Sequence, residues 1–224
     1  MTHPEKSSAC ILGSALLAIL VIGGLTLAAY TGEQDALKAS VQRGMESTVA
    51  AMATEINASD IAGLRPGDEM NPQYAAVARH LETMRSMDDR ILNAYILKVN
   101  PDGTITFLVD DLYPLDPQGS ARIGEISTAP DKAEIFGALS VPTASKQPYT
   151  TKYGSFMSAY APIDDSASGS AGNTTAVLAI DISAKDFNDY TSRGGLILIE
   201  GFVAMAIAVG AIFLFARRNG AKKD

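Results

Sequence analysis

The chain has 224 residues, of which 47% are hydrophobic, and it carries a formal net charge of −7. One cysteine, Cys10, excludes a disulfide framework, and two histidines provide no cluster of transition-metal ligands, so no metal or other cofactor is expected. The acidic balance and the absence of basic clusters exclude nucleic acid as a partner.

Two apolar segments, residues 9–30 and 195–216, stand near the two ends of the chain. Each is 22 residues long, and a helix of that length measures roughly 33 Å, enough to cross a hydrocarbon core of about 30 Å. The sequence therefore predicts two transmembrane helices, short tails at residues 1–8 and 217–224, and one domain at residues 31–194.

Basic residues flank the two apolar segments on their outer sides. Arg217 and Arg218 directly follow the second segment, whereas residues 31–194 hold 13 basic against 22 acidic residues. The positive-inside tendency predicts cytoplasmic termini and a periplasmic or extracellular domain on a two-pass protein of the cytoplasmic membrane. A cleaved signal peptide is the alternative for the first segment, but an apolar stretch of this length favours an uncleaved anchor.

The outer block begins with two helical patterns. A stripe of apolar residues over 33–57 predicts one helix that continues from the first apolar segment, and this stripe comprises Leu37, Val41, Met45, Val49, Met52 and Ile56. A core-facing helix is favoured over a coiled-coil dimer. A loop at 61–72 and a second helix at 73–87 follow.

Strand patterns replace helical ones from Ile91 onward. Alternation over 93–99 and 105–109 around an Asn-Pro-Asp-Gly turn predicts a hairpin. The Pro- and Gly-rich stretch 110–129 predicts a long loop, and Ser127 or Thr128 is the expected cap of a short helix at 130–139.

A second hairpin and a last helix complete the block. Strands are predicted at 153–163 and 174–182, joined by an exposed loop at 164–173, and Ser183 is expected to cap a helix at 184–192. Antiparallel hairpins separated by a helical lid, with a long helix before them, define an α+β class.

Several runs in this order resemble one family. The runs are NPQYAAVARHL, NAYILKVNPDGTITFLVDD, IGE, PYTTKYGSFMSAYAPI and AVLAIDISAKDF, and together they resemble the extracytoplasmic PAS-like sensor domains called Cache or PDC domains. The resemblance covers residues 33–190. It implies a PAS-like antiparallel sheet with a helical lid, a small molecule bound between sheet and lid, and a homodimer formed through the N-terminal helices.

Asp181 is the first candidate ligand residue. It interrupts the apolar run AVLAIDI, where an ionised carboxylate is costly unless it is paired or hydrogen-bonded. The resemblance implies contact with a ligand amine, and a purely structural role at the start of the next helix is equally supported. Tyr149 matches a tyrosine that precedes the pocket strand in similar domains. Two positions later those domains often have an acidic residue where this chain has Thr151, which weakens the expectation of an amine or amino-acid ligand.

The other candidates follow from residue type. Tyr95, Ser158 and Tyr160 can add hydroxyl groups, although strand tyrosines are more often simply core residues. Arg122 is the best candidate cation for a carboxylate ligand, although an isolated arginine is more often exposed. Glu200 lies within the second apolar segment, where a carboxylate is either functional or near the interface.

The function predicted from the sequence is a membrane-anchored sensor of an unidentified small molecule that lacks its own output domain and reports to a separate signalling protein. A structural or assembly subunit of a membrane complex is the alternative, as is a fragment of a longer receptor. An enzyme is not expected, because no pairing of nucleophile and base and no phosphate loop is visible.

Overall fold

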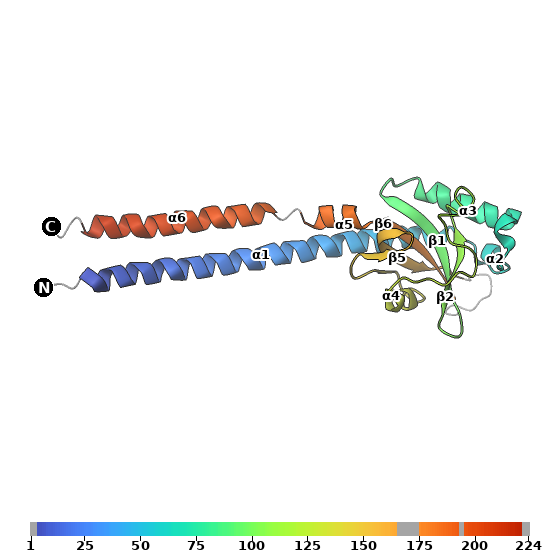
Figure 1. Ribbon diagram of the computed structural model, residues 1–224, viewed down its shortest axis with the longest axis horizontal. Helices are drawn as coiled ribbons and strands as arrows, with labels where there is room; N and C mark the ends of the chain where they lie inside the picture. The colour runs from blue at the N-terminus through green and yellow to red at the C-terminus, as the bar shows by residue number, and fades with distance from the viewer. Residues whose placement is uncertain (1–3, 165–174, 193–194, 221–224) are drawn as a thin grey trace. The chain divides into compact units, whose positions relative to one another are not determined.

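The computed structural model describes residues 4–164, 175–192 and 195–220 (Figure 1). Their fold combines helices with an antiparallel sheet, which confirms the α+β class. The chain forms two compact units, one spanning Ala39–Asp189 and the other combining Met1–Lys38 with Tyr190–Asp224. The predicted domain limits at residues 31 and 194 remain predictions.

The predicted helices are all present, and two short helices, α2 and η1, were not predicted. The described helices are α1 (Pro4–Thr54), α2 (Ala58–Ile61), the 3-10 helix η1 (Asp68–Met70), α3 (Pro72–Arg85), α4 (Lys132–Gly137), α5 (Ala184–Thr191) and α6 (Gly195–Gly220). The long helix α1 includes the first apolar segment and the stripe from Leu37 to Met52, so the expected continuity is confirmed, and Ile56 lies just beyond its end.

The sheet contains six strands in the order β2-β1-β6-β5-β3, with β4 also pairing with β5. The strands are β1 (Ile91–Val99), β2 (Ile105–Asp110), β3 (Thr143–Ala144), β4 (Tyr149–Thr151), β5 (Gly154–Pro162) and β6 (Ala176–Ser183), and every pairing is antiparallel. The sequence missed β3 and β4, because two or three residues are too short to display alternation. Most of the predicted loop at 164–173 lies outside the described residues.

One face of the sheet packs against α1 and α3. Val49 on α1 and Leu81 on α3 are fully buried in a core with the sheet residues Ile96, Met157 and Leu178. The buried members of the α1 stripe recur at helical spacing, which confirms a core-facing helix. Figure 1 shows α3 and α4 on opposite sides of the sheet.

The opposite face of the sheet is covered by the segment between β2 and β3, called the lid here (residues 111–142). Ala121 of the lid and Ile135 of α4 are buried against Leu97, Tyr160 and other side chains of this second core. Helix α4 begins after Asp131, which makes no side-chain capping bond. The predicted caps at Ser127 and Thr128 are therefore wrong, because the helix begins later than the sequence pattern indicated.

An ion pair joins α3 to the end of β2. The guanidinium of Arg85 contacts the carboxylate of Asp111, whose side chain is fully buried and also accepts a hydrogen bond from the backbone N–H of Ala94 at 3.1 Å. Burial raises the pKa of Asp111 above its usual range, and the contact with Arg85 acts in the opposite direction. The pair therefore compensates a carboxylate that has no access to water.

The second compact unit contains the two apolar helical stretches. Both are long and apolar enough to cross a membrane, and their large side chains, Leu17, Leu25 and Phe202 among them, are exposed. Gly201 lies so close to Thr26 that an added Cβ would approach the threonine Oγ1 to 2.2 Å. The junction at residues 193–194 lies outside the described residues.

Gly154 at the start of β5 provides a test of the hairpin turn. Its φ of 141° is rare for a residue with a side chain, and an added Cβ would lie 2.6 Å from the ring of Phe156. Gly154→Ala is therefore expected to lower the free energy of unfolding by about 1–2 kcal/mol. Gly63→Ala is the matched control, because no atom lies within 4 Å of its added Cβ, and equal stability of the two variants in urea unfolding of the full chain would contradict the turn geometry.

Candidate functional site

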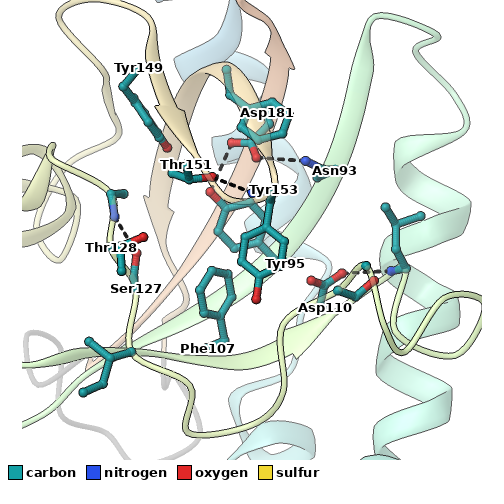
Figure 2. A pocket seen from close by; sticks show the side chains of 16 residues that line it. Asn93, Tyr95, Phe107, Asp110, Ser127, Thr128, Tyr149, Thr151, Tyr153 and Asp181 are labelled. Carbon is teal, nitrogen blue, oxygen red and sulfur yellow. Dashed lines mark hydrogen bonds between the residues drawn. The ribbon is translucent and has the colours of Figure 1, made fainter.

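A cavity of about 120 Å³ lies between the sheet and the lid (Figure 2). Its walls come from β1, β2, β4, β5 and β6 and from lid residues including Ser127 and Thr128. The cavity therefore lies where the sequence placed a ligand, between sheet and lid. A volume of this size is close to that of an internal cavity known to hold a benzene molecule, so it fits a compact solute of about six non-hydrogen atoms.

Asp181 on β6 lines the cavity, and it is only 3% exposed. Its Oδ1 accepts hydrogen bonds from Ser158 at 2.5 Å and Tyr95 at 3.1 Å, and its Oδ2 accepts one from Asn93 at 3.1 Å. Burial raises the pKa of Asp181 to about 6, although the three hydrogen bonds act to lower it. The carboxyl is thus held in position but has no cation beside it among the described residues.

A chain of hydroxyl groups leads from Asp181 to a second buried carboxyl, Asp131. Tyr149 lies 2.7 Å from Ser158 and 3.1 Å from Tyr160, and Tyr160 donates to Asp131 at 2.7 Å. Oδ1 of Asp131 has no hydrogen-bond partner among the described residues. Burial raises the pKa of Asp131, so two carboxyls that resist ionisation are joined by three hydroxyls.

The direction of these hydrogen bonds determines whether the cavity presents donors or acceptors to a ligand. The hydroxyl protons of Ser158 and Tyr160 are already directed at Asp181 and Asp131. Tyr149 therefore donates its one proton to Ser158 or Tyr160, which leaves an oxygen lone pair free on a residue that lines the cavity. Tyr149 and Asp181 thus present hydrogen-bond acceptors, which complement a ligand rich in donors.

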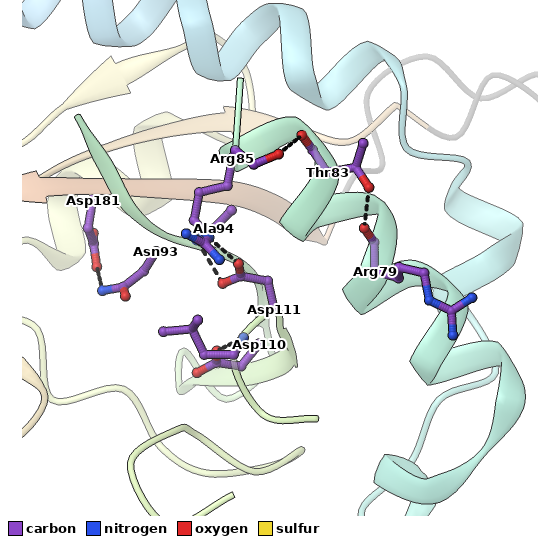
Figure 3. Close-up of polar contacts among 10 residues, drawn as sticks. Arg79, Thr83, Arg85, Asn93, Ala94, Asp110, Asp111 and Asp181 are labelled. Atoms are coloured by element: carbon purple, nitrogen blue, oxygen red, sulfur yellow. Dashed lines mark hydrogen bonds and ion pairs between the residues drawn. The ribbon is translucent and has the colours of Figure 1, made fainter. Parts of the chain in front are cut away.

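Asp110 is a cavity carboxyl that the sequence reasoning did not select. It ends β2, and its two oxygens accept hydrogen bonds from the backbone N–H groups of Leu112 at 3.0 Å and Ala121 at 2.9 Å. Burial raises its pKa to about 6. The neighbouring Asp111, the first residue after β2, points to the other side of the sheet, toward Arg85 (Figure 3).

Aromatic side chains build the remaining wall. The ring of Phe107 lies 5.4 Å from that of Tyr95 and 6.0 Å from that of Tyr153, and Figure 2 shows the three rings grouped together. The hydroxyl of Tyr153 bonds Glu125 of the lid, which also pairs with Lys152 at 2.9 Å. Sequence alternation placed these strands correctly but could not single out Phe107 or Tyr153.

The predicted candidates divide into three groups. Asp181, Tyr149 and Tyr95 line the cavity, whereas Ser158 and Tyr160 lie behind it in the hydroxyl chain. Arg122 is exposed and does not line the cavity.

Thr151, which stands where similar domains often have an acidic residue, does line the cavity. The cavity wall contains no lysine, arginine or histidine among the residues that the structure describes. In residues 4–164, 175–192 and 195–220 no three His, Cys, Asp or Glu side chains form a group suited to a metal ion.

Comparison of the chain with models of protein families gives no match, and comparison with curated protein sequences gives none either.

The raised pKa of Asp181 has a consequence for stability that can be measured. Because the folded-state pKa of about 6 exceeds the ordinary value of 3.8, the contribution of Asp181 to the free energy of unfolding is fully present below pH 4 and is lost as the pH rises through about 6. Asp181→Asn removes this titration while retaining an acceptor for Ser158 and Tyr95.

At pH 7.5 the unliganded full-length Asp181→Asn variant is expected to be about 2 kcal/mol more stable than the parent chain, and at pH 4 equally stable. Urea unfolding in detergent micelles, followed by tyrosine near-ultraviolet circular dichroism, measures both values. A variant that is less stable than the parent at pH 7.5 would contradict the assignment of Asp181 as a carboxyl that burial destabilises.

Proposed function

We propose that this protein is a membrane-anchored sensor whose outer domain binds a small polar solute. The cavity between the sheet and the lid is the observation that supports this most strongly, because it combines apolar walls with a few convergent acceptor groups. A buried carboxyl in such a wall lowers the free energy of unfolding, and binding of a ligand would offset that loss.

The fold supports assignment to the PAS-like Cache or PDC class. An antiparallel sheet with a long helix on one face and a lid on the other is compatible with this class. The order of the sequence runs that resemble these domains agrees with it. We assign the solute site to the sheet face that the lid covers.

The two apolar helices support a two-pass arrangement in a cytoplasmic membrane. Their basic flanks favour cytoplasmic termini, which would put the cavity in the periplasm or outside the cell. Ligand binding would then alter the membrane helices and, through them, a separate signalling protein. Pairing of two chains through α1 is part of this proposal.

A structural or assembly subunit is the second candidate function. It predicts a filled core and a stable protein partner instead of a ligand. The polar-lined cavity and the open lone pair of Tyr149 favour the sensor.

The test of the sensor proposal is a thermal-shift screen of the full chain in lipid nanodiscs. The panel contains small organic cations, zwitterions, anions and neutral polyols, and Asp181→Asn serves as the site variant. At least one solute is expected to raise the melting temperature of the parent chain by several degrees and that of Asp181→Asn by much less. If no solute in any class stabilises the parent chain, the sensor proposal is wrong.

A further inference from the structure

We infer that the cavity takes a short aliphatic diammonium compound, with one cationic group at Asp181 and the other at Asp110. This inference rests on the proposed function, because it names the chemical class of the solute. It also differs from the amine contact that the family resemblance implies, because it assigns the second end of the ligand to a carboxylate instead of a basic residue.

The position of the two carboxyls follows from the sheet register. Asp181 pairs with Asn93 and Asp110 pairs with Tyr95, on the two strands that flank β1. Paired residues share a face of the sheet, and so do positions two apart on β1, so both carboxyls stand on the cavity side. The two aspartates therefore belong to opposite margins of one cavity.

Strand geometry gives the separation of the two groups. Two strand spacings across the sheet and two residues along it place the Cα atoms about 12 Å apart. Because both side chains leave the same face of the sheet, their carboxylate oxygens are separated by a similar distance. Allowing about 2.8 Å for a charge-assisted hydrogen bond at each end, about 6 Å remains between the two ligand nitrogens. A saturated chain of four carbon atoms spans that distance, and a compound with four carbons and two nitrogens matches the size of the cavity.

The wall between the carboxyls favours a cation with an apolar centre. The rings of Tyr95 and Phe107 can cover methylene groups, and aromatic faces attract ammonium groups. The ring of Tyr153 extends this wall, and Nζ of Lys152 already lies 4.8 Å from its centroid. This aromatic wall is independent of the carboxyls and points to the same class of ligand. Tyr149 adds an acceptor oxygen beside Asp181.

The charges around the cavity argue against anions and amino acids. Its lining has two carboxyls and, among the described residues, no basic side chain, while Arg122 is exposed elsewhere on the lid. Burial raises the pKa of both Asp110 and Asp181, as expected for carboxyls that lack a counter-charge. A carboxylate on the ligand would meet only like charge, whereas a second ammonium meets Asp110.

The experiment is titration calorimetry of the full chain in nanodiscs at pH 7.5. The probes are 1,4-diaminobutane, 1-aminobutane, 4-aminobutanoate and butanoate, together with 1,2-diaminoethane and 1,8-diaminooctane as length variants. The four-carbon diamine is expected to bind at least tenfold more tightly than the monoamine and each length variant, since it alone reaches both carboxyls. The two probes with a carboxylate are expected to bind more weakly than the monoamine.

Variants locate the second contact. Asp110→Asn is expected to reduce the affinity for 1,4-diaminobutane to within about threefold of that for 1-aminobutane, because a buried charge-assisted bond is lost. Glu55→Gln is the matched control, because this exposed carboxylate, which directly follows α1, does not line the cavity, and it is expected to change neither affinity. The length series in the parent chain needs no substitution, so it tests the inference even if Asp110→Asn fails to fold.

The outcomes separate this inference from the proposed function. Equal binding of monoamine and diamine, or preference for an anion or an amino acid, would overturn the diammonium assignment and leave a sensor of another solute. Absence of binding by these probes and by every class in the thermal-shift screen would overturn both.

Discussion

Arg85→Met is expected to lower the free energy of unfolding of the full chain by about 3 kcal/mol. The reason is that Asp111 has a fully buried side chain whose charge Arg85 alone compensates among the described residues. Removing the guanidinium leaves a buried carboxylate that must either stay charged without a partner or take up a proton. Urea unfolding at pH 7.5, monitored by tyrosine near-ultraviolet circular dichroism, measures the loss.

Two controls define the cause of this loss. Arg79→Met on the same helix removes an exposed guanidinium, so its effect is expected to stay within about 0.5 kcal/mol. The double variant Arg85→Met with Asp111→Asn removes the orphaned charge but retains an acceptor for the N–H of Ala94, and it is expected to recover more than half of the loss. If Arg85→Met and Arg79→Met are equally stable, the ion pair does not hold α3 to the sheet.

The affinity for 1,4-diaminobutane is expected to fall about a hundredfold between pH 7 and pH 5. Both ammonium groups stay charged in this range, whereas Asp110 and Asp181 take up protons near their raised pKa of about 6. Each carboxyl that must lose its proton before binding contributes about a tenfold change, and the two changes multiply. The affinity for the diamine therefore decreases as the pH falls.

Asp110→Asn separates the two contributions. With one titrating carboxyl left at the ligand, the same change of pH is expected to reduce affinity about tenfold. Asp131 and Glu125 also titrate nearby, but each contacts protein hydroxyls and does not line the cavity. Calorimetric titration at four pH values measures the slope, and affinity that is independent of pH would show that neither carboxyl meets the ligand.

The sequence predicted those parts of the fold that depend on periodic burial. The buried residues of the α1 stripe lie in the core that also contains Met157 and Ala159. Ser158 and Tyr160, which alternate with them along β5, face the cavity side of the sheet. The short strands β3 and β4 were missed because their pairing depends on the neighbouring β5 rather than on their own pattern.

The candidate site was predicted only in part, for a similar reason. Asp181 stood out because it breaks an apolar run, whereas Asp110 follows such a run and reads as an ordinary strand end. Its position at the cavity depends on the register of β2 against β1 and on the lid backbone at Ala121. Neither the register between two strands nor the path of a loop can be predicted from the spacing of residues within a short segment.

The hydroxyl chain could not be derived from the sequence either. Tyr149 and Tyr160 meet because β4 pairs with β5, and Asp131 joins them because the lid folds over this edge. Only the residue types suggested polar groups in the wall. The absence of Arg122 from this wall removes the candidate partner for a ligand carboxylate, and the carboxyls that line the cavity favour a ligand with cationic groups.

A structure of the full chain with 1,4-diaminobutane at pH 7.5 tests the central claim most directly. One ligand nitrogen is expected within hydrogen-bond distance of Asp181 and Tyr149, and the other within hydrogen-bond distance of Asp110, with the carbon chain against Phe107. A cavity that contains only solvent at saturating diamine, or a diamine bound elsewhere on the domain, would contradict it.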